Sequence, residues 1–388
     1  MRTRTLTIVV ALVVAASCSG SDERADPEPA APSSSPGSTA TTSAPTTEPT
    51  VAPTPAPTSP PTTDTSVPSS APVTTEAPAA PAIDRVPMPD ASTVAALLGL
   101  DRPIVIAHAG GDFEAPHSTM YAFTEAALAG TDVLEMDVML TADDVLVVHH
   151  DDTVDRTTEA TGQVRDFTYD ELAALDNAHW FVAGTWSDQT RSDDAYTLRG
   201  VRTGDRPAPE GYGPDDFRIE TFRSVAMAFP DHVLDVEIKV QRTAAGEPDL
   251  ARAERTAAVL SDEIAELGRT DSVVVVSFDA ATIGAFRELA PDVATSPALD
   301  TLVTWYVGEP VEFAPTDVVF QVPPVYEGVE VLTPEVIARA QADGFDVWVW
   351  MDDTSTQETA DFYRDLLARG ADGLLVSRPT VAVDVLAS

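Results

Sequence analysis

The sequence predicts an α/β fold, a (β/α)8 TIM barrel, over residues 86–388. In this region β-branched runs of strand length alternate with helical segments, which is the pattern of parallel βα units. If the short return arm of one hairpin is counted with its strand, there are eight parallel strands, as such a barrel requires. A doubly wound open sheet is the alternative, but the first strand lacks the glycine fingerprint that often follows it in that fold.

The individual elements are expected from hydrophobic periodicity and from capping residues. Gly130, for example, is expected to end the helix that precedes the second strand. The parallel strands are expected at 103–108, in the run ending at Leu140, and at 233–240, 272–278, 293–299, 317–322, 346–351 and 373–377. The helices are expected at 92–98, 118–129, 167–175, 221–229, 250–267, 334–343 and 355–368. Residues 176–217 have few periodic apolar positions, so they are expected to form a rim or lid insertion.

The N-terminal 85 residues have a different character from the barrel. Residues 1–18 combine a basic start, an apolar run and small residues before Cys18, which resembles the signal peptide and lipidation site of bacterial lipoproteins. Residues 19–85 are rich in Pro, Thr and Ser and are expected to be a disordered linker. We therefore expect an extracytoplasmic lipoprotein of the cell surface or envelope, with secretion after ordinary cleavage near Ala16 as the alternative.

Composition limits the classes of partner. The formal net charge of −40 argues against nucleic acid and against general adhesion to anionic membranes. Membrane contact is therefore expected only through the N-terminal lipid anchor, and no protein partner is predicted. Cys18 is the single cysteine, which excludes an internal disulfide and a cysteine metal cluster.

A hairpin around the second strand carries the first group of candidate residues. Glu135 and Asp137 alternate in the apolar run and therefore share one face of the strand. Only four residues, 141–144, separate this run from the next, so the two must pair in antiparallel fashion. If Leu140 pairs with Val145, His150 lies opposite Glu135 and the two side chains share a face.

Polar residues at the ends of other strands complete the expected site. In a barrel of this type the active site lies at the C-terminal ends of the strands. His108 ends the first strand, and Glu237 and Lys239 lie near the end of the third. Lys239 is the single lysine of the chain.

The residue types indicate attack on a phosphodiester. Glu135, Asp137 and Glu237 suit one hard divalent cation, Ca²⁺ or Mg²⁺. His108 and His150 can serve as base and acid. Lys239 can neutralise a phosphate group of a small-molecule substrate.

Several motifs occur in the order found in the glycerophosphodiester phosphodiesterases, a family that the chain resembles. These motifs are IAHAGG at 106–111, LEMDV at 134–138, VVHHDDTVDRTT at 147–158, VEIK at 236–239, SF at 277–278, VWVW at 347–350 and ADGLLVSRP at 371–379. The resemblance implies a (β/α)8 barrel that releases glycerol 3-phosphate and an alcohol. It also implies His108 and His150 as acid and base, Glu135, Asp137 and Glu237 as metal ligands, Lys239 as a phosphate contact, and Trp350 as a wall of the glycerol pocket.

The chain departs from the family pattern at four places. Ala109 replaces the usual Arg after the first His, so the chain has HAGG where the family usually has HRG. Pro-His-Ser-Thr at 116–119 replaces Pro-Glu-Asn-Thr, and protonated His117 is a candidate replacement for the lost cation. The usual Asn after the late Trp strand corresponds to Asp353, and Val-Ser-Arg at 376–378 replaces the usual Thr-Asp before the final Pro.

Three other functions are compatible with the same residues. One is a phospholipase D-like enzyme of the sphingomyelinase D kind acting on a lysolipid, which the missing Arg and the long rim favour. Another is a non-catalytic surface binding module on the same scaffold. A glycosidase using Glu135 and Glu237 is a distant fourth possibility, because it assigns no role to the His pair or the Lys.

Overall fold

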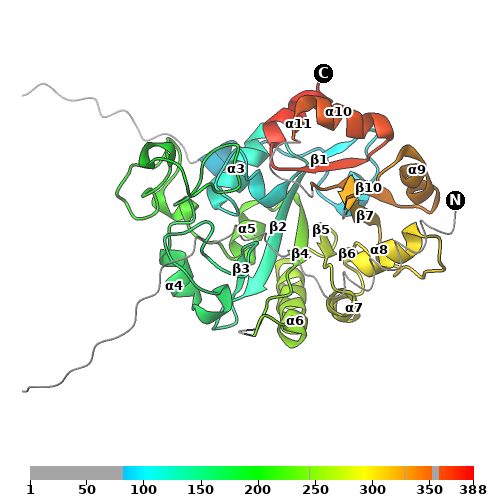
Figure 1. Ribbon diagram of the computed structural model, residues 1–388, viewed down its shortest axis with the longest axis horizontal. Coiled ribbons are helices and arrows are strands. Elements are labelled where there is room, and N and C mark those ends of the chain that lie inside the picture. Colours follow the sequence, from blue (N-terminus) through cyan, green and yellow to red (C-terminus); the bar gives the residue numbers. More distant parts are fainter. Residues whose placement is uncertain (1–81, 244, 327, 352–357) are drawn as a thin grey trace, which may run out of the picture. The chain divides into compact units, whose positions relative to one another are not determined.

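The computed structural model describes residues 82–243, 245–326, 328–351 and 358–388 (Figure 1). The expected signal peptide, its Cys18, nearly all of the expected linker and Asp353 lie outside these residues.

Eight parallel strands form the wall of the barrel, with helices around it (Figure 1). Around the barrel the strands are β1 (Ile104–Ala107), β2 (Val133–Leu140), β4 (Val233–Ile238), β5 (Val273–Val276), β6 (Ala294–Thr295), β7 (Val319–Val322), β10 (Asp346–Val349) and β11 (Gly373–Val376). β11 pairs with β1, and a single parallel bridge between Thr295 and Asp317 joins the β6 side to the β7 side. The (β/α)8 fold expected from the sequence is confirmed.

The helices begin and end at residues with the expected capping chemistry. Thr119, Thr221 and Thr333 each accept a backbone hydrogen bond at a helix N-terminus, and Gly130 ends its helix in the left-handed conformation. The α-helices are α2 (Val94–Leu97), α3 (Met120–Ala129), α4 (Tyr169–Ala174), α5 (Phe222–Ala228), α6 (Leu250–Leu267), α7 (Ala280–Leu289), α8 (Leu299–Tyr306), α9 (Pro334–Ala342), α10 (Ala360–Arg369) and α11 (Pro379–Leu386). Short 3₁₀ helices lie at η1 (Ala82–Arg85), η2 (His108–Gly110), η3 (Val164–Asp166), η4 (Asp193–Ala195) and η5 (Pro214–Phe217).

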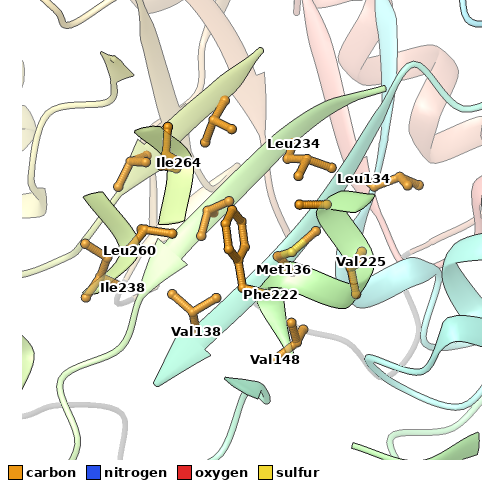
Figure 2. Packing of buried hydrophobic residues seen from close by; sticks show 14 of the residues in the cluster. Leu134, Met136, Val138, Val148, Phe222, Val225, Leu234, Ile238, Leu260 and Ile264 are labelled. Carbon is orange, nitrogen blue, oxygen red and sulfur yellow. The ribbon is translucent and has the colours of Figure 1, made fainter. Parts of the chain in front are cut away.

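Alternation along β2 and β4 separates the hydrophobic core from the candidate site. Leu134, Met136 and Val138 point outward and pack with residues of α5 and α6, among them Phe222 and Leu260 (Figure 2). The intervening carboxylates of β2 therefore face the interior of the barrel, because successive side chains of a strand point to opposite faces. Packing of the outward-facing residues against the helices therefore also directs the carboxylates into the interior of the barrel.

The expected register of the hairpin is wrong by one residue. β3 (Leu146–Val148) pairs with β2 so that Leu140 lies opposite Leu146, and not opposite Val145. The amide of Thr141 donates to the carbonyl of Val145, which leaves a three-residue loop with Asp144 in the left-handed region at φ 60°. Three-residue hairpin loops commonly place their last residue there. As a result His150 lies beyond the paired residues, and the loop after β3 positions it.

Two other expected elements differ in extent. The strand expected at 293–299 is reduced to Ala294–Thr295, and Leu299 already begins α8. Pro297 lies between them and lacks the amide proton that a continued ladder would use. The helix expected at 355–368 begins at Ala360 in the described residues. The strands β8 (Val325–Tyr326) and β9 (Val329–Glu330), each of two residues, pair in antiparallel fashion, and the sequence analysis did not predict them.

The segment 176–217 is tied to the barrel. Buried Ala178, Val201 and Phe217 form a small core of its own. The carboxylate of Asp176 accepts from the amides of Ala178 and Gly200, which holds two distant parts of the segment together. Its only helices are η4 and η5, as the low periodicity of the sequence predicts.

Candidate active site

Two carboxylates of β2 lie inside the barrel near its C-terminal end. Glu135 is 4% exposed, and its Oε2 accepts a hydrogen bond of 2.7 Å from the amide of Ala109. Asp137 is 1% exposed. Burial and the neighbouring Asp137 charge raise the pKa of Glu135 well above its ordinary value.

Lys239 connects this pair to the next strand. Its Nζ lies 2.9 Å from Oδ1 of Asp137 and 3.0 Å from Oε2 of Glu237. Burial alone would lower the pKa of Lys239, but the two carboxylates outweigh burial and raise it. Burial would also raise the pKa of Asp137, but the ammonium group overcomes that effect and lowers it. The carboxyl groups of Glu135, Asp137 and Glu237 outnumber the single ammonium group of Lys239, so the formal charge of this part of the barrel is negative.

His108 directly follows β1 and is held by a carboxylate four residues later. Its Nδ1 lies 3.0 Å from Oδ1 of Asp112. Ala109 at φ 47° and Gly111 at φ 90° turn the chain sharply between the two residues. Burial would lower the pKa of His108, but the carboxylates of Asp112, Glu135 and Asp137 raise it to about 10.

His150 is held in a similar way by the loop after β3. Its Nδ1 donates to Oδ1 of Asp151 over 2.7 Å. The Arg156 guanidinium contacts both oxygens of the same carboxylate. The neighbouring His149 points elsewhere, with its Nε2 3.0 Å from the carbonyl oxygen of Thr153, as expected for a structural residue.

The two imidazoles and Asp137 converge. One nitrogen of His108, one nitrogen of His150 and one oxygen of Asp137 lie within 4.8 Å of one another. Oδ2 of Asp137 is buried without a hydrogen-bond partner among the described residues. Two imidazole nitrogens and one unsatisfied carboxylate oxygen can hold a divalent cation. Glu237, opposite Asp137 in the strand register, and Glu135, on the same face of β2, offer further carboxylate oxygens to such an ion.

His117 lies beside the imidazoles of His108 and His150 in a buried position. Its ring centroid is 6.2 Å from that of His108 and 5.7 Å from that of His150. The side chain is buried, and neither ring nitrogen has a hydrogen-bond partner among the described residues. Burial, with the nearby positive charge of Arg156, lowers its pKa well below the ordinary value, which favours the neutral ring. A role for His117 as a replacement cation stays a prediction.

Trp350 lies on another part of the barrel mouth. It follows β10, and its ring centroid is 5.7 Å from that of Phe278, which follows β5. No ring contact joins it to the imidazoles among the described residues.

Several residues of the site were missed in the sequence analysis. Asp112, Asp151 and Arg156 orient the two imidazoles, and the last two lie within the quoted motif at 147–158. Asp235, a buried polar residue of β4, lies opposite Glu135 in the strand register and accepts from Gln321. Burial raises its pKa to about 7. Trp186 of the rim segment contacts His108, His117 and His150.

A cleft of about 630 Å³ in the described part of the chain is lined by none of the candidate site residues. It is lined by residues after β1, by part of α3, by the rim segment at Gly184 and by Arg378 at the start of α11. Nε of Arg378 is buried without a hydrogen-bond partner among the described residues.

Comparison with known proteins decides the family. Residues 108–381 match the glycerophosphoryl diester phosphodiesterase family. The chain belongs to this family. A glycerophosphodiester phosphodiesterase of Caldanaerobacter subterraneus subsp. tengcongensis is 25% identical over 285 residues, which are 74% of this chain and 98% of the relative. Human glycerophosphodiester phosphodiesterase 1 is 39% identical over 92 residues, 24% of this chain and 28% of the relative.

Solved structures of other glycerophosphodiester phosphodiesterases share the fold. A phosphodiesterase of Oleispira antarctica, in complex with the product sn-glycerol-3-phosphate, has a TM-score of 0.53 at 19% identity and covers 74% of this chain and 98% of its own. An enzyme of Agrobacterium tumefaciens has a TM-score of 0.51 at 19% identity, with 72% and 99% covered. As a glycerophosphoryl diester phosphodiesterase family member, the chain is a phosphoric diester hydrolase. Within its described residues, no helix has the length and apolar character to cross a membrane.

Proposed function

We propose that this protein hydrolyses glycerophosphodiesters to glycerol 3-phosphate and an alcohol. The observation that carries the proposal is the convergence of His108, His150 and Asp137 within 4.8 Å. Two imidazoles at this separation can serve the two oxygens that exchange protons during hydrolysis, which are the oxygen of the attacking water and the oxygen of the leaving alcohol. The matched family supports the substrate class.

The carboxylate partners prepare both imidazoles for proton transfer. Because Nδ1 of His108 faces Asp112 and Nδ1 of His150 faces Asp151, Nε2 is the nitrogen left for substrate on each ring. One imidazole accepts a proton from the attacking water as its oxygen bonds to phosphorus. The other donates a proton to the alcohol oxygen as the bond from phosphorus to that oxygen breaks. The two rings together therefore supply one acid and one base per turnover.

Glu135, Asp137 and Glu237 would hold one divalent cation, Ca²⁺ or Mg²⁺. When bound, such a cation neutralises charge on the phosphate. Lys239 is held by Asp137 and Glu237 and supplies a further positive charge to a phosphate oxygen.

Release of glycerol 3-phosphate from glycerophosphocholine by the full chain tests this proposal. The parent is expected to release it with Ca²⁺ or Mg²⁺ and to stop when a chelator is added. His150→Ala and Glu135→Gln should each lose at least about a hundredfold in kcat. His232→Gln is the matched control, because His232 precedes β4 at the opposite end of that strand from the site. Parent-level rates in the first two variants would refute the proposed roles.

We further propose that the enzyme acts outside the cytoplasm, held to the membrane by lipid on Cys18. The basic and apolar start of the chain with its single cysteine supports this proposal. The test is the partition of the protein between detergent and aqueous phases after expression in a bacterial host. The parent should enter the detergent phase and Cys18→Ala the aqueous phase. Aqueous partition of both would favour an ordinary secreted form.

A further inference from the structure

Trp186 lies on a turn that is tied to both halves of the catalytic cluster. The amide of Gly184 donates to the carbonyl of Phe113, in the segment that follows His108. The side chain of Gln189 donates to the carbonyl of Asp155, in the segment that follows His150. Ser187 adopts φ 53°, a conformation that a non-glycine residue occupies at a cost. The turn is therefore specifically held in place.

The indole ring of Trp186 covers the catalytic imidazoles. It stacks on His108 with centroids 6.0 Å apart and planes 26° apart. It meets His150 edge-on at 5.4 Å. The Arg156 guanidinium lies 4.0 Å from the centroid of the indole ring, a cation–π contact that holds the ring in place. The same guanidinium donates to the carboxylate of Asp151. A large, rigid side chain thus limits the space next to both nitrogens that exchange protons.

The other aromatic wall of the barrel mouth lies away from Trp186. Phe278 and Trp350 follow β5 and β10, and these strands flank β6 and β7, opposite β1 in the order around the barrel. Trp186 contacts His108 at the end of β1. In the order around the barrel, β2 with its carboxylates and β4, which Lys239 follows, lie between β1, where Trp186 contacts His108, and β5, which Phe278 follows. A diester whose phosphorus is held there has one arm toward each wall.

We propose that Trp186 is a specificity-determining residue that bounds the pocket for the leaving alcohol and selects small alcohols over bulky ones. The inference rests on the proposed function and on the family resemblance, which implies that Trp350 borders the glycerol arm. The indole supplies a fixed wall, because Arg156 and His108 both hold it. A bulky alcohol therefore has to displace the indole before the diester can reach both imidazoles, whereas a small alcohol does not.

Two diesters that share glycerol and differ only in the alcohol test the inference. They are glycerophosphoethanolamine, with a small alcohol, and glycerophosphoinositol, with a bulky one. In the full chain, Trp186→Ala should raise the ratio of kcat/KM for the inositol diester to that for the ethanolamine diester by about tenfold or more. Trp186→Phe, which keeps a flat ring, should stay within about threefold of the parent ratio.

Trp350→Ala is the matched control. It should lower kcat/KM for both diesters by a common factor, because the glycerol arm is identical in the two. If Trp186→Ala lowers both rates equally or leaves the ratio unchanged, Trp186 has only a structural role and the inference is overturned, while the proposed function stands. If the parent hydrolyses neither diester, the proposed function fails and the inference fails with it.

Discussion

The carboxylate of Asp151 accepts a 2.7 Å hydrogen bond from Nδ1 of His150. Arg156 contacts both oxygens of the same carboxylate and also lies over the ring of Trp186. The guanidinium group therefore links the orientation of the His150 imidazole to the indole ring that contacts both His108 and His150.

Asp151→Asn is expected to lower kcat by about a hundredfold with little change in KM. The amide can present a donor to Nδ1, which disfavours the tautomer that leaves Nε2 free to accept a proton. Steady-state release of glycerol 3-phosphate measures the effect. Asp155→Asn is the control, since within the described part of the chain that carboxylate accepts from the amide of Gly162 in the same loop and does not contact His150. An unchanged kcat in Asp151→Asn would show that Asp151 does not orient His150.

Lys239→Met is expected to lower kcat/KM by about a hundredfold and to tighten Ca²⁺ binding by about tenfold. The single ammonium charge offsets part of the charge of Asp137 and Glu237, so its removal weakens phosphate binding but leaves more negative charge for a cation. Calorimetric titration with Ca²⁺ measures the second effect. Arg165→Met, which removes a cation paired with Asp249, should leave the affinity unchanged. Weaker Ca²⁺ binding in Lys239→Met would contradict the expectation.

Gly373→Ala is expected to destabilise the barrel by about 2 kcal/mol, because the added methyl group overpacks a filled interior. Its Cβ would lie 2.7 Å from Cδ1 of Trp348 and 3.1 Å from Cγ1 of Ile104. Gly284→Ala, in α7, has no neighbour within 4 Å and should stabilise the protein by about 0.5 kcal/mol through helix propensity. Urea denaturation measures both free energies. Equal effects of the two changes would refute the packing argument.

Asp346→Asn is expected to stabilise the protein by about 1 kcal/mol at pH 7.5 and to have no effect near pH 4. Burial and the charge of Asp372 raise the pKa of Asp346 from 3.8 to about 6. Between these values the folded protein binds more protons than the unfolded chain, so the contribution of Asp346 to stability falls as the pH rises through this window. The magnitude is reduced because the carboxyl group is only half-buried. Thermal unfolding of both proteins at several pH values measures the difference, and a pH-independent difference would contradict the assignment.

The sequence predicted the barrel and most of the converging residues because these depend on local pattern. Alternation in β2 and β4 fixes which side chains face inward, and strand ends fix where they lie along the barrel. The hairpin register was wrong because it depended on the conformation of Asp144, which is in the left-handed region. No periodicity indicates that residue's backbone angle.

Trp186 could not be predicted, because its position depends on contacts between segments far apart in the chain. Gly184 bonds to Phe113 and Gln189 to Asp155, and neither pair has a sequence signature. The lowered pKa of His117 likewise follows from burial and from the charge of Arg156.

The closure of the barrel at Thr295 and Asp317 has a consequence for its dynamics. Backbone pairing there is a single bridge, and the side chains of Thr295 and Arg287 bind the carboxylate of Asp317 across it. Amides of β6 and β7 should therefore exchange with solvent faster than those of β2 and β4, which share a six-residue register. The β6–β7 closure lies opposite β1 in the order around the barrel. The barrel can therefore open transiently between β6 and β7 while the imidazoles and carboxylates near β1 and β2 keep their alignment.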